Sequence, residues 1–99
     1  MQWIEDLDDV TVELEQDGDL VVRQEARAVL SRGAWPILAF LYRERDRDGA
    51  FGPPRVTLRK FRRQHDAWRP ESKMNLSLEE AKSLSAALQA WIDTLPGEP

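Results

Sequence analysis

Five short segments, most of them closed by a turn signal, precede a single amphipathic helix in this chain. Apolar and polar residues alternate over residues 10–15 and again over 55–63, which is the period of a half-buried strand. Asp17-Gly18, between the first two segments, is a strong hairpin signal. Strands followed by one helix predict an α+β fold, here an antiparallel sheet of four to five strands with one C-terminal amphipathic helix.

The remaining segments are placed by their apolar content and by the turns between them. Residues 24–30 fit either an extension of the second strand or a short helix. The charged residues 43–49 and Gly52-Pro53-Pro54 indicate a loop, because proline cannot donate to a strand ladder. We expect strands at residues 10–15, 20–23, 35–43, 55–63 and 68–76.

The strand expected at residues 55–63 has one irregularity. Val56 and Leu58 face one side of it, and the other side receives Arg55, Thr57 and Arg59. Phe61 falls on the arginine side. The position of Phe61 on this side indicates either a bulge near Lys60 or an aromatic residue placed on the polar face.

The helix is expected over residues 77–95. Ser77-Leu78-Glu79-Glu80 has the pattern of a capping box, in which the serine and Glu80 satisfy each other's backbone amides. Pro96-Gly97 ends the helix. Apolar residues recur every three or four positions and form one stripe: Leu78, Ala81, Leu84, Leu88, Trp91 and Leu95.

A chain of 99 residues fits a single domain. Its parts are an acidic extension or hairpin (1–33), basic strands (34–76) and the helix (77–95). The lack of cysteine excludes disulfides and thiol nucleophiles. The acidic N-terminus does not resemble a signal peptide, and no apolar run is long enough to span a bilayer. We therefore expect no membrane association and a cytoplasmic location, at the nucleoid in a bacterium.

No residue pattern indicates catalysis. His65 is the only histidine and lies in a turn, so it supplies neither a catalytic triad nor a metal site. Gly49 and Gly52 lack the lysine and hydroxyl residue of a phosphate-binding loop. We expect a protein that is not an enzyme and that uses no cofactor and no metal.

The charges are distributed unevenly along the chain. Residues 43–73 hold ten of the fourteen basic residues against five acidic ones, a net of about +5, whereas the rest of the chain is at about −9. Such a chain presents a local positive field despite its overall charge of −4. Eight of the ten basic residues are arginines, which suit phosphates and base stacking.

Aromatic residues are interleaved with these cations, a combination that binds single-stranded nucleic acid. Residues 43–48 alternate in sign and equally fit a solvated hairpin tip, and residues 59–63 also fit a solvated strand edge. Trp68, among charges, is the expected stacking platform, whereas Trp35 is expected in the core and Trp91 in the core or a dimer interface. The candidate contacts are Arg55, Arg59, Lys60, Phe61, Arg62, Arg63, Trp68, Arg69 and Lys73.

Three stretches carry a family resemblance: Leu58-Arg59-Lys60-Phe61, then Arg69-Pro70-Glu71-Ser72-Lys73, then the capped helix that starts at Ser77. They resemble the C-terminal domain of single-stranded-DNA-binding transcriptional coactivators of the positive-cofactor-four type, a group related to the Whirly proteins. The resemblance covers residues 55–95, is looser over 35–54 and does not extend to 1–33. Met74 departs from it, because the family has a small residue after the lysine.

The resemblance implies a strongly curved sheet backed by the helix, a homodimer formed through both, and single strands lying along basic β-ridges. It implies contacts from Arg59, Phe61 and Lys73, with Trp68 and Arg69 beside them. A second hypothesis remains open: the same fold could bind a protein partner through the acidic N-terminus, which could also mask the basic ridge. The expected partners are therefore single-stranded DNA or RNA, a second copy of the chain, and a protein.

Overall fold

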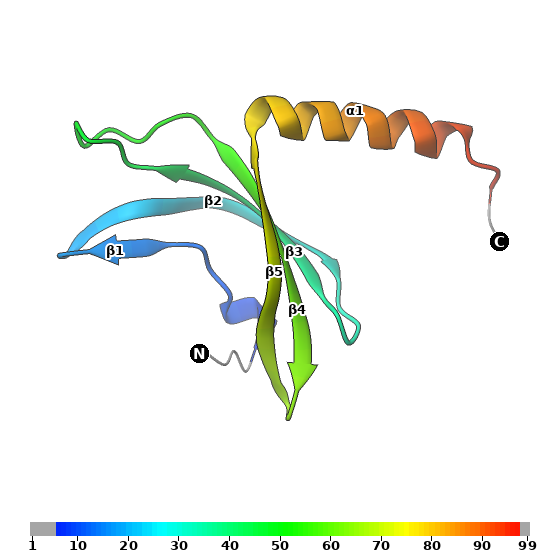
Figure 1. Cartoon of the computed structure of the whole chain (residues 1–99), viewed down its shortest axis with the longest axis horizontal. Coiled ribbons are helices and arrows are strands. Elements are labelled where there is room, and N and C mark those ends of the chain that lie inside the picture. Colours follow the sequence, from blue (N-terminus) through cyan, green and yellow to red (C-terminus); the bar gives the residue numbers. More distant parts are fainter. Residues whose placement is uncertain (1–5, 98–99) are drawn as a thin grey trace.

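The chain folds into one curled antiparallel sheet followed by a single helix, as expected (Figure 1). The computed structural model describes residues 6–97. Each strand pairs with its neighbour in sequence. The elements are a 3₁₀ turn η1 (Leu7–Asp9), the strands β1 (Leu14–Gln16), β2 (Asp19–Ser31), β3 (Ile37–Glu44), β4 (Arg55–Gln64) and β5 (Ala67–Ser77), and the helix α1 (Leu78–Thr94).

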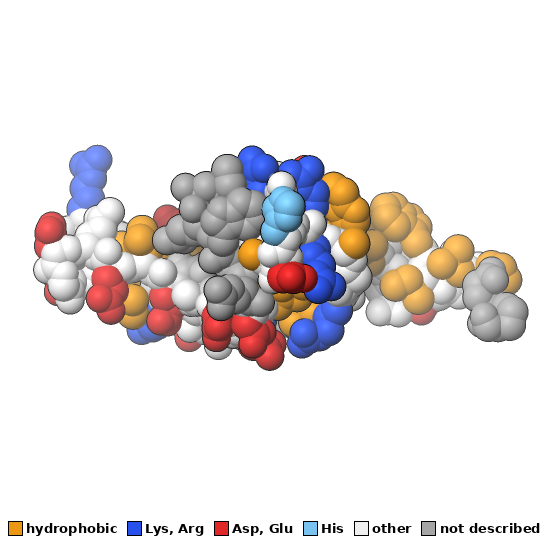
Figure 2. Space-filling view, turned by 90° about the horizontal axis from the view of Figure 1, so that it is seen from below, with side chains coloured by type: hydrophobic (Ala, Val, Ile, Leu, Met, Phe, Trp, Pro, Cys, Tyr) orange, Lys and Arg blue, Asp and Glu red, His pale blue; other side chains and the backbone are white. Residues whose placement is uncertain are grey.

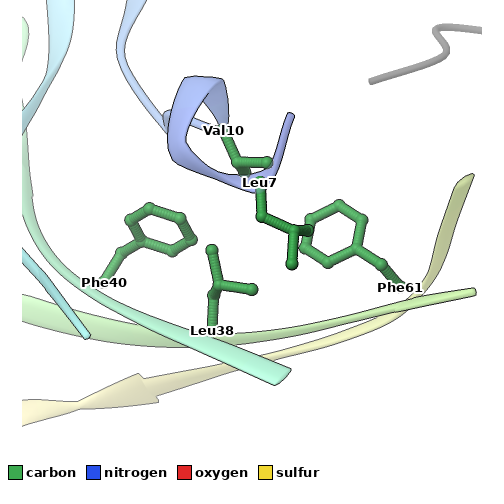
Figure 3. Close-up of a cluster of buried hydrophobic side chains, with 5 residues drawn as sticks. All are labelled: Leu7, Val10, Leu38, Phe40 and Phe61. Atoms are coloured by element: carbon green, nitrogen blue, oxygen red, sulfur yellow. The ribbon is translucent and has the colours of Figure 1, made fainter. Parts of the chain in front are cut away.

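The core lies on the inner face of the curl, which we define by Leu38, Phe40 and Phe61. These side chains are at most 3% exposed. Leu7 and Val10, from the segment before β1, pack onto them and close the cluster (Figure 3). Side chains that are paired across neighbouring strands point to the same side of a sheet, so Thr57, opposite Phe40, also belongs to the inner face.

The outer face carries the alternate residues of the same strands. Ala39 pairs with Leu58, and Leu41 pairs with Val56. These four side chains are only half-buried. The helix α1 leaves the end of β5 and runs away from the sheet (Figure 1), so the apolar part of the outer face is incompletely covered.

The N-terminal half of the chain resolves one open prediction and corrects another. Residues 24–30 continue β2, with register shifts after Gln24 and Val29, so the helix alternative is wrong. The strand expected at 10–15 is wrong for residues 10–13. Val10 and Val12 turn onto the inner face and pack at the core, and the Gln24 side chain accepts hydrogen bonds from Val12 N (3.2 Å) and the Thr11 hydroxyl (3.0 Å).

The bulge expected near Lys60 is confirmed, whereas the alternative of an aromatic residue on a polar face is wrong, because the side that Phe61 shares with Arg59 is the buried one. The register shifts between Lys60, opposite Ser72, and Phe61, opposite Pro70. The extra residue, Glu71, lies on β5, so the alternation along β4 is unbroken. Phe61 therefore stays on the same face as Arg59, and that face is the core.

The helix begins as expected, with a complete capping box. The Ser77 hydroxyl accepts from Glu80 N (3.1 Å), and the Glu80 carboxylate accepts from Ser77 N (2.9 Å). No residue of α1 is buried, and Trp91 is 61% exposed. The interpretation of Trp91 as a core residue is therefore wrong. Within residues 6–97, no helix is both long enough and apolar enough to cross a membrane.

Candidate nucleic-acid interface

The β4–β5 hairpin brings all nine candidate residues onto two adjacent strands. A two-residue turn joins the strands, and both His65 and Asp66 have positive φ (53° and 62°), as a type I′ turn requires. Arg59 lies opposite Lys73, and Arg63 lies opposite Trp68. Figure 2 looks toward the tip of this hairpin, where Lys and Arg side chains gather around the single histidine.

Strand alternation divides these nine residues between two faces. Successive side chains of a strand point to opposite sides, so the run of cations along β4 does not form one ridge. The pairings place Arg55, Arg59, Phe61, Arg63, Trp68 and Lys73 on the inner side, and Lys60, Arg62 and Arg69 on the outer side.

On the inner side, Arg59 is held by a hydrogen-bond chain. Arg59 Nε donates to Thr57 Oγ1 (3.0 Å), and the Thr57 hydroxyl donates to Asn75 Oδ1 (2.7 Å). Thr57 is fully buried, so the chain fixes the guanidinium over the sheet. Thr57 and Asn75 are not among the site residues predicted from the sequence, although neutral polar side chains two positions from Arg59 and Lys73 on the same faces of their strands are the signal for such a support.

Two grooves meet at Arg59 and Lys73. One, of about 340 Å³, is lined by both cations together with Val10, Thr11 and Phe61. The other, of about 290 Å³, continues past the same cations to Glu13 and Tyr42. The N-terminal segment therefore forms one wall of each groove. A chain of phosphates lying in either groove would meet Arg59 and Lys73, because both cations line both grooves.

The two aromatic residues of the inner side differ in exposure. Phe61 is 3% exposed beneath Leu7 and Val10, so neither face of its ring is open to a base in this conformation. Trp68 is half-buried against the core. The guanidinium of Arg63 lies 5.8 Å from the Trp68 ring centroid.

On the outer side, Trp35 lies among cations. Its ring centroid is 5.3 Å from Lys60 Nζ and 5.9 Å from the Arg62 guanidinium. Trp35 is 47% exposed, so its expected place in the core is wrong. It precedes Pro36 and the start of β3, which puts it at the rim of the sheet. Its ring and the nearby Arg69, opposite Arg62, make this cluster the most accessible cation–aromatic group on the outer side.

Acidic partners neutralise some of the cations but not all. Arg62 lies 3.8 Å from Glu71, and Arg63 lies 3.4 Å from Asp66. Within residues 6–97, no acidic group lies at ion-pair distance from five of the nine candidates: Arg55, Arg59, Lys60, Arg69 and Lys73.

Two of the three cations in residues 43–48 are engaged elsewhere. Arg43 Nε lies 3.0 Å from Glu25, and Arg45 lies 3.7 Å from Asp19. The hydrogen bond from Arg23, together with the charges of Arg23 and Arg43, holds the pKa of Glu25 below its usual value. This environment fits a solvated hairpin tip with internal ion pairs.

The described part of the chain contains no group of three or more His, Cys, Asp or Glu side chains that could hold a metal ion. No family model, curated protein or solved structure matches the chain. The likeness to the positive-cofactor-four type therefore stays a prediction from residues 55–95.

Proposed function

We propose that this protein binds single-stranded nucleic acid through β4 and β5. The observation that carries the proposal is the set of five cations without acidic partners among residues 6–97, which lie on adjacent strands, with one of them, Lys60, beside the exposed Trp35. Arg59 and Lys73 contact phosphates in the inner groove. Trp35 stacks a base at the rim, with Lys60 and Arg62 beside it.

The chemistry of the two sites suits unpaired strands better than duplex. A base–aromatic stack contributes about 1–3 kcal/mol and needs a base that is free of its partner. Duplex readers usually insert a basic helix into the major groove, whereas α1 carries three acidic residues and one lysine. A coactivator-like role in transcription follows from the resemblance alone and is part of the same proposal.

A second function is favoured by the position of the acidic N-terminal segment. Residues 7–12 lie on the inner face, and Val10 and Thr11 line the groove of Arg59 and Lys73. An acidic segment beside the cations of this groove supports a module that binds a protein instead of a nucleic acid.

Binding of fluorescent oligonucleotides tests the first function. Oligo-dT, oligo-rU and a duplex are titrated with the full chain over a range of salt concentrations. Each phosphate contact to a single strand contributes about 0.7 to the slope of log K against log salt. Replacing Arg59 and Lys73 by alanine should lower that slope by about 1.4.

The matched control removes the same charge elsewhere. Arg47 and Lys82 lie in a loop and on α1, away from both grooves, so the R47A/K82A variant should keep the wild-type slope to within about 0.5. Equal affinity of the R59A/K73A variant and the wild type would exclude the inner groove as the site. Absence of binding to every oligonucleotide at low salt would favour the protein-binding function.

A further inference from the structure

The strand β5 is an open edge of the sheet. It is the last of the five strands and pairs only with β4 (Figure 1). Among the residues that the structure describes, no backbone hydrogen bond joins the other side of β5 to a strand or a loop. Residues 70–75 are all exposed. The described part of the chain therefore leaves a way around β5, from the inner side of the sheet to the outer side.

Cations without acidic partners within residues 6–97 lie on both sides of this edge. Arg59 and Lys73 belong to the inner side, and Lys60 and Arg69 belong to the outer side. All four lie on β5 itself or on β4, and neighbouring strands are only about 4.8 Å apart. Arg59 and Lys60 are adjacent in sequence but face opposite sides, so the surface path from one to the other passes over β5.

The inner groove reaches the same edge. The groove of Arg59 and Lys73 is lined on one side by residues 70–73 of β5 and on the other by Val10 and Thr11. It therefore runs between the N-terminal segment and the last strand of the sheet. A chain of phosphates that leaves this groove past β5 arrives on the outer side.

The edge is suited to a crossing strand at this point. The extra residue Glu71 interrupts the ladder, and its carboxylate lies 3.8 Å from Arg62, so a cation already neutralises it. Ser72 is exposed and lies opposite Lys60 on the outer side. A phosphate that passes over β5 would meet this hydroxyl and then the lysine.

On the outer side the path ends at Trp35. Backbone hydrogen bonds from the Phe61 and Arg63 amides hold residues 34–36 beside β4, on the side away from β5. Trp35 is thus about two strand spacings, or about 10 Å, from the edge. Lys60 Nζ lies 5.3 Å from its ring centroid. A base that follows the phosphate at Lys60 therefore reaches an exposed aromatic ring.

We propose that one nucleic-acid strand crosses the β5 edge, so that the inner groove and Trp35 bind the same molecule. The crossing rests on the proposed function and adds the class of strand that fits. A strand that turns over an edge bends sharply, and bases that stack on one another resist the bend. Weak stacking and a flexible backbone are what make pyrimidine runs preferred ligands of sequence-tolerant sites. A duplex, with a persistence length of about 50 nm, is too stiff. The ligand is a flexible, pyrimidine-rich single strand.

Joined tracts test the crossing. Two oligo-dT tracts of about four nucleotides each are linked by a flexible abasic spacer and compared with a single tract by fluorescence anisotropy. Because the second contact becomes intramolecular, we expect the joined molecule to bind about 100-fold more tightly. A duplex spacer of the same length, which cannot bend over the edge, should remove this gain. Uridine tracts form a parallel series, so the gain is measured separately for DNA and RNA.

Variants of each half provide the controls. R59A/K73A removes the inner half and W35L removes the outer half, so each should reduce the gain to about 2-fold, the statistical advantage of two tracts at one remaining half. Lys82→Ala, on α1, removes a cation outside both halves and should keep the full gain. Circular dichroism establishes that each variant is folded.

The outcomes separate the crossing from the proposed function. If a single tract binds but the joined molecule binds no more tightly than about 2-fold better, the crossing is overturned and the proposed function stands. A ratio of one joined molecule to two chains also overturns it, because the halves then lie on different copies. Absence of binding by every tract at low salt means that the proposed function itself fails. Joined dT tracts should bind about 3- to 10-fold more tightly than joined dA tracts, and equal affinities would overturn the pyrimidine preference.

Discussion

Phe61 is a core residue that has cations on both sides of it in the sequence. Its ring packs with Leu7, Leu38 and Phe40, and truncating such a ring costs about 3–5 kcal/mol. We expect Phe61→Ala to lower the free energy of unfolding by about that amount, as measured by urea denaturation. Leu14→Ala, at an exposed position, should change it by less than about 0.5 kcal/mol. A loss below about 1 kcal/mol for Phe61→Ala would place the ring outside the core.

Trp35 is expected to act in binding rather than in folding. Trp35→Leu keeps apolar contacts at the rim but removes the stacking surface, so the affinity for oligo-dT should fall by about 5- to 150-fold. Trp91→Leu is the matched control, because Trp91 is also exposed but lies on α1. Equal losses in the two variants would mean that the tryptophan beside Lys60 has no special role.

At the residue scale, the sequence predicted which side chains of β4 share a face of the sheet, but not which of the two faces is buried. Alternation separates Val56 and Leu58 from Thr57 and Arg59, and apolar side chains would ordinarily mark the core. Here Leu7 and Val10 cover the face of Thr57 instead. Because this coverage comes from a contact between distant segments, no local pattern reveals it.

At the scale of elements, α1 depends on its first turn more than most helices do. It buries no residue of its own, and helices in proteins gain most of their stability from packing. The capping box satisfies two backbone amides that would otherwise lack partners. The hydrogen bond from the Ser77 backbone, followed by that from its hydroxyl, lowers the pKa of Glu80 below its usual value.

That lowered pKa gives the helix a pH dependence. A carboxylate whose folded-state pKa is depressed contributes stability above its unfolded pKa and loses it as the pH falls through the folded value. Glu80→Gln keeps a capping-box residue but removes the charge. We expect the variant to be less stable than the wild type at neutral pH, and the difference to shrink to nothing in acid. Thermal unfolding from about pH 7 to about pH 2 measures this difference in stability. A difference that stays constant with pH would contradict the role of the Glu80 charge.

Elements with a local signature were the ones that the sequence placed correctly. The capping box located α1, and Asp17-Gly18 located the β1–β2 turn, where Asp17 and Gly18 have positive φ. The strand prediction failed for residues 10–13. Val10 and Val12 alternate with polar residues as in a strand, but both pack at the core, and Val12 N donates to the Gln24 side chain instead of to a strand ladder. The alternation of apolar and polar residues alone does not distinguish an edge strand from a segment that lies across the face of a sheet.

At the scale of the whole molecule, the two faces of the sheet are covered in different ways. The chain's own N-terminal segment covers the inner face, whereas the outer face and α1 stay open. The candidate cations are divided between these two faces, because alternation along β4 and β5 sends some to each. The segment that completes the core therefore also brings one acidic residue, Glu13, into the groove of Arg59 and Lys73.

This arrangement predicts that the acidic segment tunes binding through its charge. Glu13 lines the groove of Arg59 and Lys73, and Asp9 precedes Val10 at the other groove. The double substitution Asp9→Asn with Glu13→Gln changes no core residue, so the variant should keep the fold. At low salt we expect oligo-dT affinity to rise about 3- to 10-fold, since each exposed charge contributes up to about 1 kcal/mol.

This rise in oligo-dT affinity must shrink as salt screens the charges. The control, which neutralises two acids on α1 (Glu79→Gln with Asp93→Asn), should raise the affinity little. If neither pair of substitutions changes the affinity, the N-terminal segment is a structural cover only. If binding appears only after the charges of Asp9 and Glu13 are removed, the segment masks the cations, and the ligand of the intact chain must displace it. Fluorescence anisotropy of a labelled oligo-dT distinguishes these outcomes, because none of the substitutions removes Leu7 or Val10, which close the core.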